Sequence, residues 1–291
     1  MRILCVGLAT VDLIQRVDRL PGVDEKIQSE SVEVAAGGPA TNAAVTAAVL
    51  GASSGIEVVL LSAVGSHPLG ALIRADLAAY GVTLIDAAPD STEPPPVSAV
   101  TVLAGTGERT IVSRNAGTRA VPVPAAGLPD ADLTLVDGHH PVLAVAAARA
   151  ANRLVVDAGS RRPVFTDIFP YAEVVACSAD FHPGPSNATG PGPHRTAGER
   201  DAVTAAAIPA PAVIITHGPG PVRWFTASGR GEIPVPPVDA VDTSGAGDAF
   251  HGALATALAR RDDLETAVRS AIRVAGTRVA HPGPRAWLSH L

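Results

Sequence analysis

Seven consecutive residues near the end of the chain could carry out group-transfer chemistry: Asp242-Thr243-Ser244-Gly245-Ala246-Gly247-Asp248. They open a run of small and apolar residues that predicts a long helix over 246–260. The glycines leave the N–H groups of Gly245, Ala246 and Gly247 uncovered, and the positive end of the helix dipole adds to them. Such an anion hole suits a transferring phosphoryl group, and Asp248 could accept the proton of an attacking hydroxyl.

The alternative for this run is a plain glycine-rich helix start, in which Asp248 only caps the helix. The two common nucleotide-binding loops are absent from the sequence. The one lysine, Lys26, has no Gly-x-x-x-x-Gly-Lys context. No Gly-x-Gly-x-x-Gly follows the apolar strand expected over 2–9. A nucleotide would therefore bind by another route.

The elements that must position these residues are short apolar strands alternating with helical patterns along the 291 residues. This alternation predicts an α/β fold in one domain over 1–291, with a mainly parallel central sheet flanked by helices on both faces. Residues 13–35 and 96–116 break the alternation, and we expect them to form a small β-sheet lid. Pro and Gly crowd 182–198, which predicts a mobile surface loop.

Composition excludes several classes of partner. The formal net charge is −6 and no Lys/Arg block occurs, which argues against nucleic acid. No apolar run reaches the ~18 residues of a membrane span, and we see no signal peptide, so we expect a cytoplasmic protein. Cys5 and Cys177 lie in apolar strand-like runs and are interpreted as buried small hydrophobic residues.

Two segments far apart in the sequence resemble the PfkB/ribokinase family of carbohydrate kinases. Residues 242–254, DTSGAGDAFHGAL, resemble its C-terminal motif, and residues 37–44, GGPATNAA, resemble its Gly-Gly-x-x-x-Asn segment. Asp12 matches the early aspartate of the family. The resemblance covers about 2–285. It implies a ribokinase-like fold and an ATP- and Mg²⁺-dependent transfer of the γ-phosphate to a sugar hydroxyl, with Asp248 as catalytic base.

The resemblance also implies a sugar site. Its expected residues are Asp12, Gly37, Gly38, Asn42 and Asp137. A carboxylate accepts hydroxyl protons, an amide both donates and accepts, and glycine lets a sugar approach the backbone. The alternatives are a turn carboxylate for Asp12 and a helix cap for Asn42. Three residues of the expected lid hairpin are candidates for substrate recognition: Arg109, Arg114 and Asn115. The alternative is that they belong to an ordinary solvated hairpin.

For the nucleotide, residues 214–220, IITHGPG, resemble the Thr-x-Gly-x-x-Gly run of the family. The implied ATP contacts are Ser178, Thr216, Gly218, Gly220, Ala275, Gly276 and Val279; for the last three, a buried helix packed on the sheet is the alternative.

The metal sites that the resemblance implies are altered or incomplete in this sequence. The Asn-x-x-Glu motif tied to Mg²⁺ is not intact, and Asp180 stands near its place as a substitute acid. Some family members hold a monovalent cation such as K⁺. Asp242 and Ser244, with carbonyls near Ala280 and Gly283, stand where that ion would bind.

The substrate is less closely defined. Residues 135–140 and 155–180 resemble ketohexokinases, and residues 261–283 resemble bacterial sulfofructose kinases, which favours a ketose. A nucleoside or sugar-phosphate kinase of the same fold is one alternative. A non-catalytic sugar-binding regulator is another. The open edges of the expected lid predict a homodimer that pairs through it.

Overall fold

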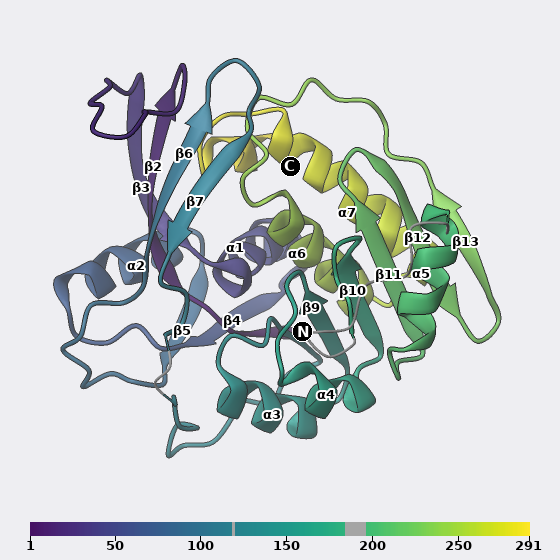
Figure 1. The fold of residues 1–291 in the computed structure, drawn as a ribbon. Helices are drawn as coiled ribbons and strands as arrows, with labels where there is room; N and C mark the ends of the chain where they lie inside the picture. Colours follow the sequence, from purple (N-terminus) through teal and green to yellow (C-terminus); the bar gives the residue numbers. More distant parts are fainter. Residues whose placement is uncertain (118–119, 184–195) are drawn as a thin grey trace.

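The computed structural model describes residues 1–117, 120–183 and 196–291 (Figure 1). Most of the loop expected over 182–198 lies outside these ranges. A nine-stranded sheet forms the centre, in the order β13-β12-β11-β10-β9-β8-β1-β4-β5. All neighbouring strands from β11 to β5 are parallel, whereas β12 and β13 are antiparallel. The predicted mainly parallel sheet is confirmed.

The strands of this sheet are short and mostly buried. Their bounds are β1 Arg2–Val6, β4 Glu57–Ser62, β5 Val82–Asp86, β8 Leu133–Val136, β9 Leu154–Ala158, β10 Val174–Ser178, β11 Ala212–His217, β12 Gly220–Thr226 and β13 Gly229–Ile233. In β1, Ile3 and Cys5 belong to one core and Leu4 and Val6 to the other. Because both faces are covered, the inner strands β1, β4, β8 and β10 are almost entirely apolar rather than alternating with polar residues, whereas the edge strands β12 and β13 carry charged residues.

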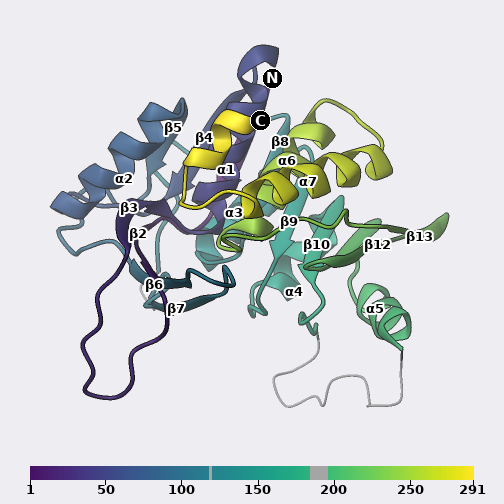
Figure 2. The same cartoon turned by 90° about the horizontal axis from the view of Figure 1, so that it is seen from above.

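Helices cover the two faces as separate layers (Figure 2). One layer holds α1 Pro39–Gly51, α2 Pro68–Ala79, α6 Ala246–Ala259 and α7 Leu264–Val279. The other holds α3 Pro141–Ala150, α4 Phe165–Ile168 and α5 Ala197–Ala206. Three 3₁₀ turns complete the helical elements: Ala52–Ser54, Phe169–Tyr171 and Ala286–His290. None of the helices in the described ranges is long and apolar enough to cross a membrane.

The lid is a four-stranded sheet in the order β3-β2-β6-β7, beside the main sheet (Figure 1). Its strands are β2 Thr10–Val17, β3 Ser31–Gly37, β6 Val97–Leu103 and β7 Arg109–Ser113. The predicted small lid sheet is confirmed. β2 leaves β1 after only three residues, so the lid begins at the carboxyl edge of the main sheet.

The candidate functional residues lie at that edge. Because β1, β8, β9, β10 and β11 are parallel, their carboxyl ends lie side by side. The residues at or just beyond these ends include Leu8, Asp137, Asp157, Ser178 and Thr216. In open α/β sheets ligands bind outside the carboxyl ends of the strands.

Helix α6 packs closely on α1 at Gly252. A Cβ atom there would lie 2.4 Å from the Ala43 carbonyl oxygen and 2.7 Å from Thr46 Cβ. Helix propensity alone would make Gly252→Ala more stable than the parent, because alanine favours a helix more than glycine does. A loss of stability in this variant would therefore come from the close contact with α1. We predict a loss of about 1–3 kcal/mol in the free energy of unfolding, measured by urea denaturation. Gly105→Ala, where a Cβ meets nothing within 4 Å, is the control; equal values for the two variants would contradict the packing.

Candidate active site

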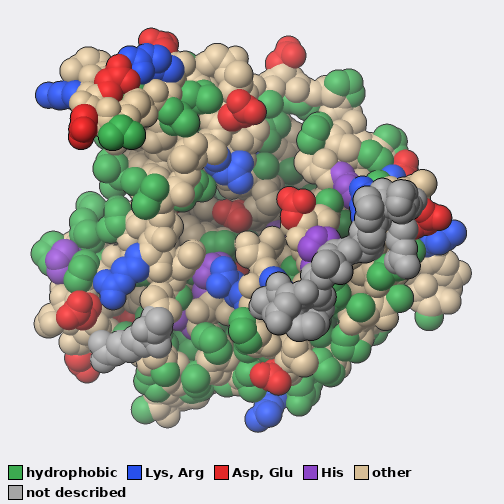
Figure 3. Space-filling view, in the orientation of Figure 1, with side chains coloured by type: hydrophobic (Ala, Val, Ile, Leu, Met, Phe, Trp, Pro, Cys, Tyr) green, Lys and Arg blue, Asp and Glu red, His purple; other side chains and the backbone are tan. Residues whose placement is uncertain are grey.

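A cavity of about 420 Å³ lies between the lid and the carboxyl edge of the main sheet. Figure 3 shows a hollow between the lid and the main body in which acidic, basic and histidine side chains gather. The predicted residues from both ends of the chain meet in its lining, including Asp12, Gly38, Asn42, Asp137, Gly245, Gly247 and Asp248.

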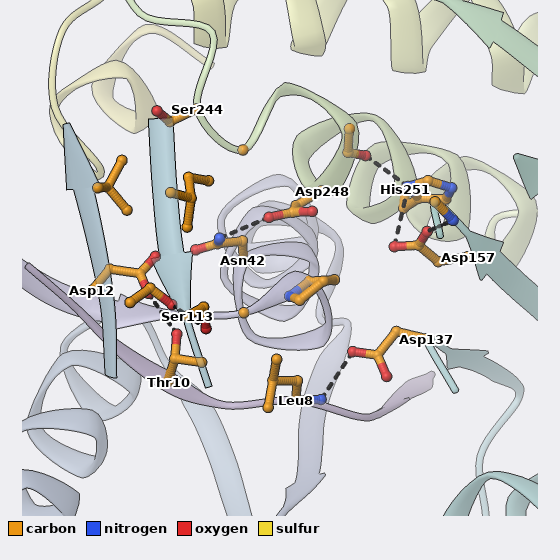
Figure 4. Close-up of a pocket in the computed structure, with 18 of the residues that line it drawn as sticks. Leu8, Thr10, Asp12, Asn42, Ser113, Asp137, Asp157, Ser244, Asp248 and His251 are labelled. Atoms are coloured by element: carbon orange, nitrogen blue, oxygen red, sulfur yellow. Dashed lines mark hydrogen bonds and ion pairs between the residues drawn. The ribbon is translucent and has the colours of Figure 1, made fainter. Parts of the chain in front are cut away.

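The first feature of the site is a hydrogen bond between the two sequence motifs (Figure 4). The Asn42 amide Nδ2 on α1 donates to Asp248 Oδ2 on α6 at 2.8 Å. Arg285 Nη1 donates to Asn42 Oδ1 at 3.2 Å, which fixes the amide with its N–H toward Asp248. Arg285 is itself held by Asp76 at 2.7 Å and by the Ala36 carbonyl at 2.7 Å. The sequence offered no local signal for Arg285, because its partners lie on α1, α2 and β3.

The second feature is the start of α6. Gly245 adopts φ 68°, a left-handed conformation that favours glycine. Hydrogen bonding within the helix starts with Ala249 N–H, which donates to the Gly245 carbonyl. The N–H groups of Gly245, Ala246 and Gly247 precede it and have no partner inside the helix. A Cβ at Gly247 would meet nothing within 4 Å, so the space beside this loop is open to an anion.

The third feature is Asp12 on β2, which faces the cavity from the lid side (Figure 4). Thr10 Oγ1 donates to Asp12 Oδ1 at 2.6 Å. A Cβ at Gly37 would lie 2.0 Å from Asp12 Oδ2, so only glycine leaves room for this carboxylate. Burial raises the pKa of Asp12; hydrogen bonds from Thr10 and Ser98 oppose the change and the charge of Asp248 adds to it.

Asp137 has a different environment from that of Asp12. It is 3% exposed and accepts hydrogen bonds from Leu8 N at 2.9 Å, Ala40 N at 3.2 Å and His139 N at 2.9 Å. Burial alone would raise the pKa of Asp137, but His139 and these backbone donors hold it below its usual range. Asp137 therefore ties β1, the start of α1 and β8 together, and its contact with sugar stays a prediction.

The start of α1 corrects an interpretation of Thr41. The spacing of Thr41 from the apolar residues 43–50 suggests that it caps this helix, which is wrong. The helix begins at Pro39, with Gly38 in the capping position at φ 95°. Thr41 is buried and its Oγ1 donates to the Leu8 carbonyl at 3.1 Å.

A buried pair that sequence reasoning missed lies beneath the anion loop. His251 Nδ1 lies 2.7 Å from the Gly247 carbonyl and Nε2 lies 3.2 Å from the Ala176 carbonyl. Both ring nitrogens of His251 therefore face backbone carbonyl oxygens. Asp157 Oδ2 lies 3.4 Å from His251 Nδ1. Burial raises the pKa of Asp157 despite the opposing effect of His251.

The lid hairpin contacts the anion loop directly. Arg109 Nη1 donates to the Thr243 carbonyl and to Thr243 Oγ1, both at 3.0 Å. Thr243 N donates to the Gly107 carbonyl at 3.1 Å. Of the candidate specificity residues, Arg109 and Asn115 line the main cavity. Arg114 lines a neighbouring hollow.

The expected nucleotide contacts are split between two places. Ser178 and Thr216 line the main cavity at the ends of β10 and β11. The others lie outside its lining: Gly218 on the β11–β12 turn, Gly220 at the start of β12, and Ala275, Gly276 and Val279 on α7. For these residues the ATP contact stays a prediction.

Metal ligands are few. The described residues contain no group of three His, Cys, Asp or Glu side chains arranged to hold a metal. Asp180 is exposed, in the turn after β10, and its metal role stays a prediction. Mg²⁺ commonly binds through one or two carboxylates, water and substrate phosphates. The site fits Mg²⁺ only if the nucleotide brings most ligands, with Asp157 the carboxylate at the end of β9 beside them.

The two thiols play no part in the site. Cys5 and Cys177 are free and buried, as predicted. Burial raises the pKa of Cys5 to about 12 and also raises that of Cys177, so neither is a thiolate at neutral pH.

Comparison with known proteins decides the family. The sequence pattern of the pfkB family carbohydrate kinases matches residues 1–290. The chain belongs to this family. As a PfkB carbohydrate kinase it binds ATP and transfers a phosphoryl group to an alcohol.

Two relatives match this PfkB kinase over nearly their whole length. Ribokinase of Bacillus subtilis is 29% identical, with 97% of this chain and 94% of the relative covered. An ATP-dependent ribose-1-phosphate kinase of Halopiger xanaduensis is 26% identical over 98% of this chain and 94% of its own. The crystal structure of a candidate ribokinase from Agrobacterium tumefaciens superimposes with a TM-score of 0.83, at 26% identity over 99% of this chain and 94% of its own. These relatives confirm the ribokinase-like fold and leave the ketohexokinase resemblance a prediction.

Asp12 gives a stability test of the site. The pKa of Asp12 is higher in the folded protein than in the unfolded chain. At a pH above the folded pKa, the ionised carboxylate therefore lowers the free energy of unfolding. This loss disappears as the pH falls below the pKa of Asp12 in the unfolded chain. We predict that Asp12→Asn has the higher free energy of unfolding at pH 7, by about 1.4 kcal/mol for each pH unit of the raise. The gain should vanish below about pH 4. Urea denaturation against pH tests this, with exposed Asp90→Asn as control; a variant less stable than the parent at pH 7 would refute it.

Proposed function

We propose that this PfkB kinase uses ATP to phosphorylate a hydroxyl of a small sugar, with Asp248 as the base. One observation carries the proposal: Asp248 lies between Asn42, which bonds it at 2.8 Å, and the uncovered N–H groups at the start of α6. Asp12 faces the same cavity from the lid. A carboxylate, an anion hole and a polar sugar subsite are the parts that phosphoryl transfer to an alcohol needs.

In this proposal each residue has a separate role in the reaction. Asp12 and Asn42 bind sugar hydroxyls and orient the acceptor. Asp248 takes the proton as the hydroxyl oxygen bonds to the γ-phosphorus and the bond to the β-phosphate oxygen breaks. The N–H groups of the anion loop stabilise the charge on the transferring group. Mg²⁺ would be held mainly by the nucleotide, with Asp157 nearby, and would supply neutralisation of phosphate charge.

For the acceptor, ribose is the first candidate, because two relatives that span nearly the whole chain carry ribose in their names. A ketose is the second, from the resemblance of residues 135–140 and 155–180 to ketohexokinases. One observation favours a phosphorylated sugar as a further candidate: Arg162 brings a cation, hydrogen-bonded to His139, into the cavity lining.

A coupled ADP-release assay over ribose, fructose, other aldoses and ketoses, nucleosides and sugar phosphates separates these readings. We expect the highest kcat/KM with a free sugar. Turnover confined to phosphorylated sugars would move the assignment to a sugar-phosphate kinase acting through Arg162. Sugar binding by calorimetry with no ADP release from any acceptor would favour the non-catalytic regulator.

Asp248→Asn tests the base. We predict that kcat falls by about 10²–10⁴, because general-base catalysis is lost, while sugar affinity changes little. Stopped assays of ADP give kcat and calorimetry gives sugar affinity. Asp263→Asn, at the exposed start of α7, is the matched control and should retain parental turnover. Parental turnover in Asp248→Asn would sink the assignment.

We also propose that two chains pair through their lids. The edge strands of the lid expose apolar side chains: Val32 and Val34 on β3 are 57% and 52% exposed, and Ile111 and Val112 on β7 are 48% and 73% exposed. Open strand edges with apolar residues favour association.

Sedimentation tests the pairing. We predict a dimer at micromolar concentration and a monomer for Val112→Glu, because a charge would be buried at the contact. Val203→Glu, an exposed position on α5 away from the lid, should remain dimeric. A monomeric parent would refute the proposal.

A further inference from the structure

The buried carboxylate of Asp242 stands directly behind the anion loop. Asp242 is 2% exposed. Its Oδ1 accepts from Ser244 N at 2.9 Å, and its Oδ2 accepts from Gly283 N at 3.1 Å. A negative charge this close to the loop opposes the binding of phosphate unless a cation compensates it.

Arg278 on α7 supplies that cation. Its Nη2 donates to Asp242 Oδ2 at 3.0 Å, and its side chain is 4% exposed. Its Nη1 donates to the His281 carbonyl at 3.0 Å and lies 3.4 Å from the Asp242 carbonyl. The guanidinium therefore occupies the space between one carboxylate and two carbonyl oxygens, the kind of oxygen set that would otherwise surround a monovalent cation.

These contacts do not fit a K⁺ ion. Both carboxylate oxygens of Asp242 and the His281 carbonyl already accept hydrogen bonds within the protein. An ion brought to the same oxygens would meet the like charge of Arg278, which stays protonated at all accessible pH values. The expectation that Asp242 and Ser244 hold K⁺ stays untested, and the geometry favours the opposite outcome.

The guanidinium also lies close to the loop itself. A Cβ built on Gly245 would lie 3.9 Å from Arg278 Nε. Gly245 is the residue that directs the chain into α6. Arg278 thus lies beside the loop that contains the N–H groups, among the residues that line the cavity, and contributes a fixed positive charge there.

We propose that Arg278 is a built-in cation for the anion loop, a positioning residue that replaces a monovalent ion, so that this kinase works without K⁺. The proposal rests on the kinase function proposed above. It assigns to one side chain both the neutralisation of Asp242 and the support of the loop. It does not depend on which sugar is the acceptor.

The test compares KCl with choline chloride at equal ionic strength, in turnover and in Tm. We expect the parent to show the same kcat and the same Tm in both salts. Activation or thermal stabilisation of the parent by K⁺ would overturn the proposal. The Tm comparison needs no acceptor, so it shows whether K⁺ binds even if no sugar is turned over. Failure of this proposal can therefore be told apart from failure of the kinase assignment.

Variants make the test specific. Arg278→Met should lower kcat/KM for ATP about tenfold or more, since charge behind the loop is lost, and should acquire a K⁺-dependent gain in turnover and Tm. Asp242→Asn/Arg278→Met removes both charges, which restores stability and abolishes the K⁺ response. Arg273→Met, at an exposed position on the same helix, is the control. Parental turnover and no K⁺ response in Arg278→Met would contradict the inference.

Discussion

The hydrogen bond between Asn42 and Asp248 is the constraint on which the site depends. It joins residues 206 positions apart in the chain, and it forms only if α1 and α6 cross at close range beside the carboxyl edge of the sheet. Gly252 permits the crossing, since any side chain there would collide with Ala43. Arg285 then fixes which way the Asn42 amide faces. Asp248 and the side of the cavity that carries Asn42 are thus positioned by one bond and its support.

Several carboxylates are buried around that bond, and each contacts a different set of groups. Asp137 is satisfied by backbone donors and acts as a tie between elements. Asp242 pairs with the guanidinium of Arg278, and Asp157 lies 3.4 Å from the ring of His251. Asp12 is left without a cation in direct contact, and burial raises its pKa. Asp12 faces the cavity, so stability is given up where polar groups of a bound substrate would repay it.

The sequence predicts those parts of the site whose residues are close together in the chain. Asp248 with its glycines and Asn42 with Gly38 form contiguous motifs, and the run of small and apolar residues over 246–260 predicts α6 well. Arg285, the Asp157–His251 pair and Arg278 each act through partners on other elements, so no local pattern marks them. Glycine and charged residues interrupt the apolar alternation of β12 and β13, so no pattern predicts this hairpin, and Thr41 precedes an apolar run like a cap although Gly38 and Pro39 start the helix earlier.

The central claim is that the two motifs act as one catalytic unit, and a double-mutant cycle tests it most directly. The kcat/KM for the best sugar is measured for the parent, Asn42→Ala, Asp248→Ala and the double variant. Residues in direct contact at a catalytic centre lose activity non-additively. We predict that the double variant is no slower than Asp248→Ala alone. A loss equal to the product of the two single losses would show that the residues act independently and would contradict the account.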